Sequence, residues 1–438
     1  MIVRFRCDKK LISMTALALF TAIPVYQCMA DTAYDSATNS AARGRVFVSL
    51  SYVPAFDGVA GFDINETNES TRAILPYMSD RRTQVLRTNN FDWAAMGTEI
   101  TFGHSTDVAL AGSIGLKIKS TRIELEVGHE MFTAQIPASQ GARKREPGGY
   151  FVLPKIMAYD VINGNTARLG ESLSIQSAED IETFAHILHA SHPEVDSLIC
   201  KNGKKVIVQS NEQLVRSMLG LKDELGSNCD GKRDDALRLF YKTFPDPGLS
   251  VAVSNEGRGQ WPKVSRRNTR KYSLVGAGHV TTDSSAKVAE DITDMGLDNR
   301  VVVAEHLAKT VEGGEVVEIR AVYSTSFVIN ACYDAEIGMS AVPYACVGFG
   351  GNLVDIADTI TPKLAYKLKA GIAYRLSSSI SAYLGGFFHH VLGDGQYAKL
   401  PVYKLVDDIS PEGRTGNSAV AQFGLSYTGC EMGFRLMF

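Results

Sequence analysis

Charged side chains recur two, four or six positions apart in three segments of the sequence, and this even spacing places them on one face of an extended strand. The positions between them are largely apolar. The charged set consists of Arg122, Glu124, Glu126, Lys363, Lys367, Lys369, Arg375, Glu431 and Arg435. Because both signs occur on one face, these groups can line a water-filled path, or they can pair with one another and fill it.

Other chemistry finds little support in the residue pattern. The sequence lacks a nucleophile elbow, a phosphate-binding P-loop and a zinc-ligand spacing, and Gly348-Phe-Gly350-Gly351 does not have the GxGxxG spacing of a dinucleotide site. His389 and His390 are adjacent on an expected strand, so their rings point to opposite faces and cannot share a metal ion. We therefore expect no catalytic residue, no metal ion and no cofactor.

The surroundings of two cysteines predict that they form a structural pair. Cys200 and Cys229 lie about 30 residues apart in polar, Gly-containing sequence, and an exported protein meets oxidising conditions. We expect a disulfide between them. Cys332, Cys346 and Cys430 lie in strand-like runs, where we expect buried or lipid-facing thiols.

The charged segments belong to a series of alternating segments that predict β-strands. The final one, 429–438, places Cys430, Met432, Phe434, Leu436 and Phe438 on one face and ends on an aromatic residue, as outer-membrane barrels do. We expect Phe438 to face lipid and to act in barrel assembly. The other predicted strands are 44–54, 107–118, 122–133, 322–334, 338–349, 363–376 and 380–391.

The connections between these strands differ greatly in length. They run in order as about 50 residues, a tight turn, about 190, a tight turn, a dozen, a serine turn and about 28. An even strand number with long loops at one end is typical of an outer-membrane barrel. The fold class predicted is therefore all-β, a transmembrane antiparallel barrel of about eight strands. Short strands at 97–103 and 150–159 would raise that number.

The longest connection, 135–321, interrupts the barrel and loses the two-residue period. Ser177 to Asp180 resembles a helix-capping box ahead of Ile181, Phe184 and Leu188 at helical spacing. Segments 213–221, 285–294 and 301–311 also have helical spacing, and the last ends at Gly313-Gly314. This region predicts a partly helical, water-exposed lobe rather than a catalytic domain.

The amino-terminal segment and the composition place the protein outside the cytoplasm. Residues 1–30 combine Arg and Lys, a short apolar run and small residues before a cleavage point, which predicts a signal peptide and a mature chain of 31–438. Lys plus Arg number 45 against 48 for Asp plus Glu, so no basic excess points to nucleic acid. We expect the bacterial outer membrane, with the lobe at the cell surface.

Several long runs resemble a known family. They include AKTVEGGEVVEIRAVYSTSFVINACYDAE from Ala308, VPYACVGFGGN, ITPKLAYKLKAGIAYRLS, LVDDISPEGRT, the terminal GCEMGFRLMF, and LSYVPAF, TRAILPY, NNFDW and RIELEVGHE in the first half. Together they resemble the major surface antigen family of Anaplasma and Ehrlichia, in particular its variable outer-membrane proteins similar to major surface protein two. The family's hypervariable centre, marked by paired cysteines and Trp-Pro, is matched by Cys200, Cys229 and Trp261-Pro262. The resemblance implies a surface-exposed, immunodominant protein that forms pores in several members.

Two functions follow as expectations, neither of them enzymatic. The first is a porin-like barrel that passes small hydrophilic solutes and displays a variable antigenic lobe. The second is a non-conducting display barrel that acts as adhesin or immune decoy, which agrees with the side-chain-filled interiors of most eight-stranded barrels. The partners expected are outer-membrane lipid, the barrel assembly machinery, and host antibodies or the host-cell surface, with small solutes as well if the lumen is open.

Overall fold

The computed structural model describes most of the chain from residue 44 onward. It covers 44–438 apart from 57, 69–70, 77–84, 97–98, 106–108, 137–145, 202–203, 207–226, 230–240, 244–247, 254–262, 268–278, 337–339 and 417. The expected signal peptide, the helix expected at 213–221 and the Trp261-Pro262 pair lie outside the described residues.

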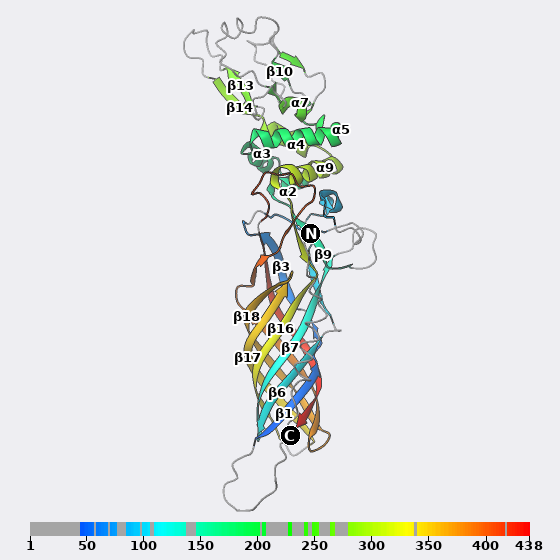
Figure 1. The fold of residues 1–438 in the computed structure, drawn as a ribbon, viewed down its shortest axis with the longest axis vertical. Coiled ribbons are helices and arrows are strands. Elements are labelled where there is room, and N and C mark those ends of the chain that lie inside the picture. The colour runs from blue at the N-terminus through cyan, green and yellow to red at the C-terminus, as the bar shows by residue number, and fades with distance from the viewer. Residues whose placement is uncertain are drawn as a thin grey trace, which may run out of the picture. The chain divides into compact units, whose positions relative to one another are not determined.

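Eight long antiparallel strands close into a barrel (Figure 1). Each strand pairs with its neighbour in the ring, and the last pairs with the first through partners such as Leu50 and Phe434. The ring therefore has no free edge, which removes the unpaired backbone groups that lipid cannot satisfy. In order, the strands are β1 (Arg45–Tyr52), β6 (Leu110–Ile118), β7 (Thr121–Ile136), β16 (Ala321–Asp334), β17 (Ala341–Ile356), β18 (Thr359–Arg375), β19 (Ile380–Leu392) and β22 (Ala419–Met437).

Alternation along each strand separates an apolar outer face from an inner face. On β18, Leu364, Leu368 and Ile372 are exposed, whereas Lys367 and Lys369 are buried. The same alternation holds on β22, where Met432, Phe434 and Leu436 face outward. These faces are those that the two-residue period predicts.

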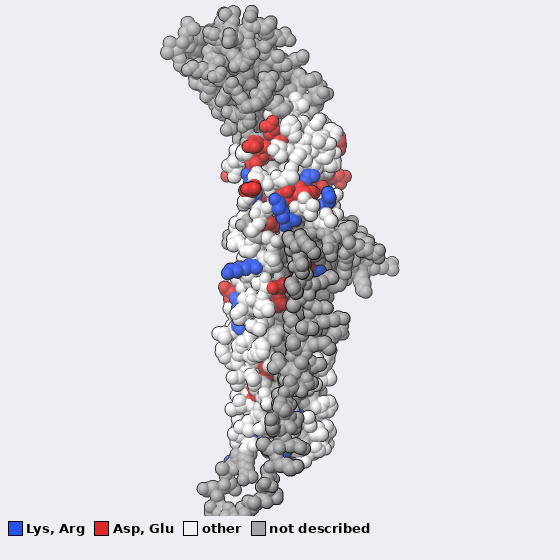
Figure 2. All heavy atoms as spheres, viewed as in Figure 1, with Lys and Arg blue, Asp and Glu red and all other residues white. Residues whose placement is uncertain are grey.

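The outer face has the composition of a lipid-facing wall. Figure 2 shows few charged atoms on the visible barrel wall, while charges of both signs gather over the helices of the insert. Aromatic rings occur at two levels of β18, with Tyr366 near its middle packed against Phe388 and His390, and Tyr374 eight positions further on at its end. Eight residues span roughly 26 Å along a strand, or about 20 Å across the membrane at the usual tilt. Among the described helices, none is both long and apolar enough to span a membrane.

One connection differs from the sequence expectation. The dozen residues expected between the strands at 338–349 and 363–376 are mostly strand, because β17 extends to Ile356 and β18 begins at Thr359. Only Ala357 and Asp358 form the turn, and both have positive φ, 49° and 60°. Two residues with φ > 0 are the signature of a type I′ hairpin turn. The long connections at this end are therefore three: β1 to β6, β7 to β16, and β19 to β22.

Short strands extend the barrel wall beyond the ring. The first half of β22 pairs with β3 (Val59–Glu66) and β20 (Gln396–Leu400), and residues further along it pair with β2 (Ala55–Phe56). β7 pairs with β5 (Thr101–His104) and β8 (Glu146–Pro147). The strand expected at 97–103 is thus present as β5, but it extends the edge of β7 and does not enlarge the ring.

The insert (residues 135–321), or lobe, contains helices with their own apolar core and short strands between them. The helices are α2 (Ile156–Asn163), α3 (Thr166–Ser174), α4 (Ala178–Ser191), α5 (Pro193–Asp196), α7 (Leu249–Val253), α8 (Ser285–Thr293), α9 (Leu297–Leu307) and the π-helical η5 (Ala308–Glu312). Ser177 caps α4 by accepting a hydrogen bond from the Asp180 backbone N–H, and η5 ends at Gly313 with φ 76°. Leu169, Phe184, Val288 and Leu307 belong to its core.

Small sheets complete the described chain. β9 (Gly149–Leu153) and β15 (Glu315–Ile319) pair with each other and with β4 (Leu75–Pro76) and β21 (Tyr403–Lys404). β10 (Lys204–Val206) pairs with β11 (Ser227–Asn228) and β12 (Tyr241–Thr243), and β13 (Lys263–Arg267) pairs with β14 (His279–Asp283). Two short 3-10 turns, η1 (Thr88–Asn90) and η2 (Trp93–Ala95), precede β5. The strand expected at 150–159 is β9, followed directly by α2.

Candidate functional site inside the barrel

The barrel brings most of the predicted lumen residues into one cluster. Seven of the nine are buried, and they come from β7, β18 and β22: Arg122, Glu124, Glu126, Lys367, Lys369, Glu431 and Arg435. Lys363 lies on the same face of β18 but near its first end, where it pairs with Asp394. Arg375 is the exception, because it lies at the last residue of β18, half exposed, and pairs with Glu336 outside the lumen. These nine residues therefore do not line one continuous path.

Lys369 lies at the centre of the cluster. Its Nζ is 2.6 Å from Glu126 Oε2, 2.9 Å from Glu124 Oε1 and 3.4 Å from Glu431 Oε2. The register explains this convergence, since neighbouring inner positions on β7 supply two carboxylates and β22 supplies the third from the other side of β19. A buried ammonium group needs such partners, because an unpaired charge in the interior is costly.

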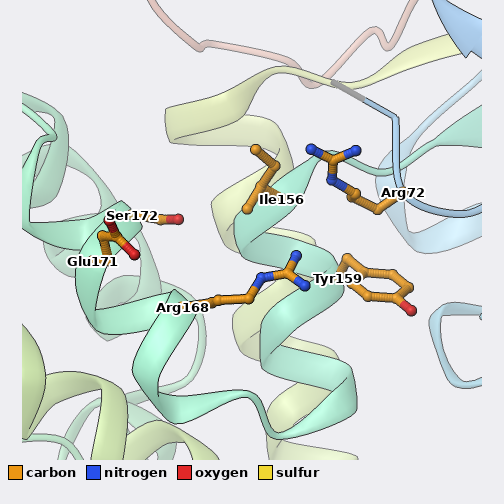
Figure 3. Close-up of a pocket in the computed structure, with 6 residues that line it drawn as sticks. All are labelled: Arg72, Ile156, Tyr159, Arg168, Glu171 and Ser172. Atoms are coloured by element: carbon orange, nitrogen blue, oxygen red, sulfur yellow. The ribbon is translucent and has the colours of Figure 1, made fainter. Parts of the chain in front are cut away.

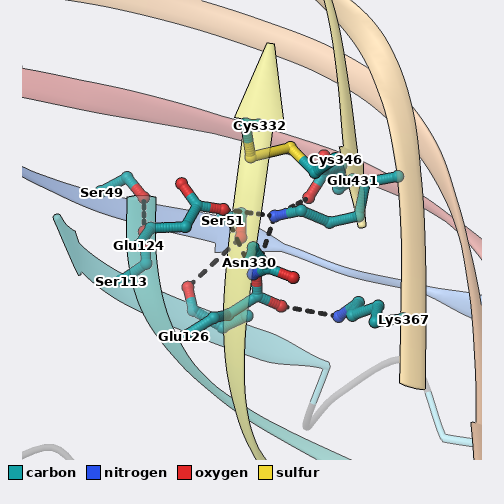
Figure 4. A network of polar contacts seen from close by, with 12 residues as sticks. Ser49, Ser51, Ser113, Glu124, Glu126, Asn330, Cys332, Cys346, Lys367 and Glu431 are labelled. Carbon is teal, nitrogen blue, oxygen red and sulfur yellow. Dashed lines mark hydrogen bonds and ion pairs between the residues drawn. A yellow bond between two sulfur atoms is a disulfide. The ribbon is translucent and has the colours of Figure 1, made fainter. Parts of the chain in front are cut away.

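A second lysine closes the cluster on the side of β19. Lys367 Nζ lies 2.7 Å from Glu126 Oε1 and 4.4 Å from the centre of the Phe387 ring (Figure 4). The Asn330 amide of β16 donates to both Glu124 and Glu126, at 3.3 Å and 3.0 Å. Each carboxylate thus has a cation on one side and an amide donor on the other.

The cluster continues towards the end of the barrel where β22 ends and the carboxyl terminus lies. Arg122 donates to Glu124 at 3.1 Å and also contacts Asp334. Lys117 of β6 contacts the same Asp334 at 2.8 Å. Arg435 is held instead by two rings, with its guanidinium carbon 5.1 Å from the centres of both Phe47 and Tyr383.

Several residues of the cluster were not among the predicted set. Asp334, Asn330 and Lys117 have the inner parity of their strands, so the period was sufficient to find them. Tyr344, whose hydroxyl donates to Glu431 Oε1 at 2.7 Å, follows Pro343 on β17 and carried no charge to mark it. His389 of β19 is fully buried, and its ring stacks on that of Tyr427 with their centres 4.8 Å apart.

The cysteines of the barrel correct one expectation. Cys332 and Cys346, expected as free thiols, face each other in the pairing of β16 with β17 and form a disulfide inside the barrel. Both are buried, and Arg122 Nη2 lies 3.5 Å from Cys346 Sγ. Sequence spacing did not reveal this bond because it depends on which residues of the two strands lie opposite. Cys430 is free and on the outer face, and the structure also joins Cys200 to Cys229.

The disulfide also removes a possible metal site. Within the described residues, Glu124, Cys332 and Cys346 are the group whose ligand atoms lie close enough to hold a metal ion. Both sulfurs are already bonded to each other, whereas a metal needs deprotonated thiolates. The group therefore cannot coordinate a metal ion while the disulfide is intact.

Apolar side chains fill the barrel interior beyond the charged cluster. Phe132, Val322, Val354 and Ala365 are fully buried there, and Phe423 and Tyr427 pack in the same apolar cluster. The strands that extend the wall add Ile64 and Tyr397, and Tyr397 stacks on Phe423 at 4.2 Å. Among the charged residues themselves, the space next to Glu124, Lys369 and Arg435 is too small for a water molecule. The interior is thus occupied by ion pairs at one level and by an apolar core at the next.

A closed antiparallel ring with an apolar exterior and buried polar groups inside defines the class of protein, a transmembrane β-barrel. The model of the surface antigen family matches residues 38–438, and the chain belongs to that family. It is an outer-membrane surface antigen with surface exposure. The family description names no enzymatic activity.

Individual proteins resemble this chain to different degrees. The major surface antigen 4 of Anaplasma marginale is 30% identical over 173 residues, which are 38% of this chain. The match spans 59% of that relative's length. Among solved structures, OprG of Pseudomonas aeruginosa gives a TM-score of 0.33 at 6% identity, covering 90% of this chain and 96% of that one. Neisserial surface protein A gives 0.21 at 7% identity, covering 90% and 97%. Likenesses of this size have no bearing on function.

Proposed function

We propose that this protein is a non-conducting display barrel: the eight strands anchor it in the outer membrane, and the lobe is presented to the host as adhesin or immune decoy. The observation that carries the proposal is the filled interior. Glu126, Lys367 and Lys369 block one level of the lumen by direct ion pairs. Phe132, Val354 and Phe423 occupy the next level with apolar side chains.

The energetic argument favours a barrel that stays closed. Opening a path past Lys369 requires its contacts with three carboxylates to separate, and any of these charges that stays buried without a partner is strongly unfavourable. Opening the second level would expose buried aromatic rings to water, at roughly 25 cal/mol per Å². Passive diffusion of small hydrophilic solutes, the other function expected from the sequence, would need both levels to open together.

The helices of the lobe support a role in display because their apolar core is separate from the barrel interior, whereas β9 and β15 contribute Phe151 and Val317 to the cluster inside the barrel. The apolar residues of the helices, Leu169, Phe184, Val288 and Leu307 among them, form a cluster distinct from the one that contains Phe132 and Phe423. The Cys200–Cys229 disulfide belongs to the lobe's cluster. A unit with its own core and covalent bond can change its surface sequence without disturbing the strands. Host antibodies or a host-cell surface are the partners proposed for it, and the barrel assembly machinery is the partner proposed for Phe438, whose side chain is 69% exposed.

Solute flux tests the closed state. We expect liposomes that contain the refolded full-length protein to swell in arabinose no faster than protein-free liposomes, with a general diffusion porin in the same lipid as the positive control. Folding is verified on the same sample by heat-modifiable migration on a gel. Swelling above the protein-free rate by folded protein would refute the closed barrel and favour the porin function.

Cysteine labelling on intact cells tests the display. In a Cys430→Ser background, Ile175→Cys places a thiol between α3 and α4 at a position that is 79% exposed, and Ser378→Cys places one in the turn between β18 and β19. We expect a membrane-impermeant maleimide to label position 175 on intact cells and position 378 only after the outer membrane is permeabilised. The reverse order would show that the lobe faces the periplasm.

A further inference from the structure

The cleft between α2 and α3 supports no ligand assignment. Its volume is about 410 Å³, and it is lined by Arg72, Ile156, Tyr159, Arg168, Glu171 and Ser172 (Figure 3). Arg168 Nη2 lies 3.2 Å from Oδ1 of buried Asp160, and Arg72 takes part in a further interaction. Both arginines are therefore engaged within the protein, and the lining leaves no free cation for an anionic ligand.

The disulfide inside the barrel lies where another protein cannot reach it. Cys332 and Cys346 are each only 3% exposed, and they form a buried cluster with Tyr344, Ala373 and Tyr383. Figure 4 shows the bond among the polar side chains of the interior. A ring of eight strands has room inside for side chains but not for a second protein. An enzyme that makes this bond therefore cannot act on the closed barrel.

Most of the groups that cover the two sulfurs come from strands outside the β16–β17 hairpin. Ala373 belongs to β18 and Tyr383 to β19. Arg122, whose Nη2 lies 3.5 Å from Cys346 Sγ, belongs to β7. The sulfurs are therefore covered only once β7, β18 and β19 have joined the hairpin.

The hairpin by itself brings the two cysteines together. Cys332 and Cys346 are directly opposite in the pairing of β16 with β17, with their Cα atoms 4.0 Å apart and only 14 positions between them in the chain. Beyond them the pairing continues, because the Ala335 backbone N–H donates to the Pro343 carbonyl. No other strand is needed to place one thiol beside the other.

The order of strand pairing favours early contact between the thiols. The β16–β17 pairing is local, whereas β7 ends at Ile136 and reaches β16, which begins at Ala321, only across the whole lobe. Local contacts form sooner than distant ones, because closing a long connection has a larger entropic cost. The hairpin is therefore expected to form while its inner face is still open to the periplasm.

We propose that the Cys332–Cys346 bond is made in the β16–β17 hairpin before the ring closes, by exchange with the disulfide of a periplasmic dithiol oxidase. One hairpin thiolate attacks the disulfide of this carrier protein and forms a mixed disulfide, and the carrier's second sulfur leaves as a thiolate. The other hairpin thiolate attacks the hairpin sulfur of the mixed disulfide, so the Cys332–Cys346 bond forms and the carrier is released as a dithiol. Two electrons pass to the carrier, whose two thiols take up the two protons that the hairpin thiols lose.

This order lets oxidation select the register of the hairpin. A slip of one residue moves one thiol to the other face of the sheet, where the second cannot reach it. Only hairpins in the native register are then oxidised, and they enter the ring with that register fixed. The proposal goes beyond the display function and holds whether or not the lumen conducts, because a carrier protein enters an eight-stranded barrel in neither case.

Arrest of barrel assembly in a bacterial host separates the two possible orders. Cys200→Ser, Cys229→Ser and Cys430→Ser leave Cys332 and Cys346 as the only cysteines of the full-length chain after residue 30. With the host's barrel assembly machinery depleted, thiols are blocked with a maleimide and the peptides that contain them are identified by mass spectrometry. We expect the bond in most of the unassembled chain, which lacks heat-modifiable migration. Thiols that stay reduced in this pool, and are oxidised only in the heat-modifiable barrel, overturn the proposal.

Removal of the host's dithiol oxidase tests the partner. We expect both thiols to stay reduced in the unassembled chain of this host, and to be oxidised again when the oxidase is supplied from a plasmid. Oxidation that is equally complete without the enzyme assigns the bond to a small oxidant and overturns the exchange with a carrier.

A cysteine pair one position out of register tests the hairpin. In the same background, Cys346→Ser combined with Ala345→Cys places the second thiol at an outward-facing position of β17, opposite in face to Cys332, and shortens the chain between the thiols by only one residue. We expect the unassembled chain of this variant to be oxidised at least about fivefold more slowly than that with Cys332 and Cys346, because the hairpin separates the two faces. The comparison precedes assembly, so it does not depend on whether the variant barrel folds. Equal rates would show that the bond forms in an unstructured chain and would overturn the role of the hairpin.

Discussion

Replacing Lys369 with Met tests whether the ion cluster holds the barrel together. The substitution keeps most of the side-chain volume and removes a charge that lies within 3.4 Å of three carboxylates. Loss of one partner from a buried ion pair costs about 3 to 5 kcal/mol. Glu124 and Glu126 each keep one cation, Arg122 and Lys367, so the lower end of this range, about 3 kcal/mol, is expected.

Urea titration in detergent, followed by the heat-modifiable fraction on a gel, measures this loss. With a slope of about 2 kcal/mol per M, the unfolding midpoint should fall by about 1.5 M. Lys363→Met is the matched control, because Lys363 is on the same strand and face but forms a solvent-accessible pair with Asp394, worth about 1 kcal/mol or less. Adding Glu126→Gln to Lys369→Met should recover part of the loss. Equal midpoints for the two lysine variants would refute the reasoning.

Three further predictions concern the lobe and the disulfide in the barrel. Burial raises the pKa of Glu305 to about 7, so between pH 7 and pH 4 the folded lobe binds this proton more readily than the unfolded chain, and acid stabilises it. Burial lowers the pKa of His306 to about 4, so over the same range the unfolded chain binds the proton more readily, and acid destabilises the folded lobe. Relative to the parent, Glu305→Gln should lose stability as the pH falls and His306→Gln should gain it, by at most about 1.4 kcal/mol per pH unit. Urea unfolding at several pH values measures the slope of the unfolding free energy against pH, and equal slopes for the parent and both variants would contradict these pKa shifts. Because Cys332 and Cys346 are both only 3% exposed, their thiols in a chain refolded in reductant should react with an added oxidant far more slowly than in urea, as measured by mass spectrometry of the peptides that contain them; equal rates for these two cysteines would show that the barrel interior opens. Ser177→Ala should lower the stability of the lobe by about 1 kcal/mol, because its Oγ caps α4, and leave heat-modifiable migration of the barrel unchanged; a change below about 0.3 kcal/mol would argue against the cap.

The faces of the strands could be predicted because lipid and interior impose opposite requirements on alternate residues. On β18 this rule placed Lys367 and Lys369 inside and Leu368 outside, as the structure has them. The helix start at Ser177 was also predictable, since a cap needs only local sequence. These features depend on neighbours within a few residues.

The features that were not predicted depend on partners far away in the chain. Lys369 and Glu124 are 245 residues apart, and their contact follows from the register of strands across the ring. The Cys332–Cys346 bond likewise requires two particular residues of adjacent strands to be opposite. The turn at Ala357 and Asp358 was missed because Gly350 and Gly351 interrupt the apolar pattern of β17, while pairing with β16 continues the strand through them.

Distance also explains why the closed interior did not follow from the charged residues alone. The sequence shows that charges of both signs occur on inner faces. Charged residues that line an open lumen and charged residues that pair across a closed one have the same composition. The difference lies in whether opposite charges reach each other across the lumen. Arg375 illustrates this, because it has the inner parity of β18 yet lies at the barrel end and pairs with Glu336. Position along the strand, which the period does not give, decides its role.

The ion cluster has a further consequence for how this barrel selects its register. Where the interior is apolar, as around Val354 and Ala365, the inner face resembles the lipid face, and apolar patterning distinguishes the two only weakly. A slip of β18 by one residue exchanges its faces. It would place Lys367 and Lys369 in lipid, at about 2 to 4 kcal/mol each near the midplane, and leave Glu124 and Glu126 without cations. Buried ion pairs add little net stability compared with a well-packed apolar replacement. Their effect here is to penalise a one-residue slip of β18 by several kcal/mol, so the charged level opposes an exchange of faces that the apolar level, by itself, would allow.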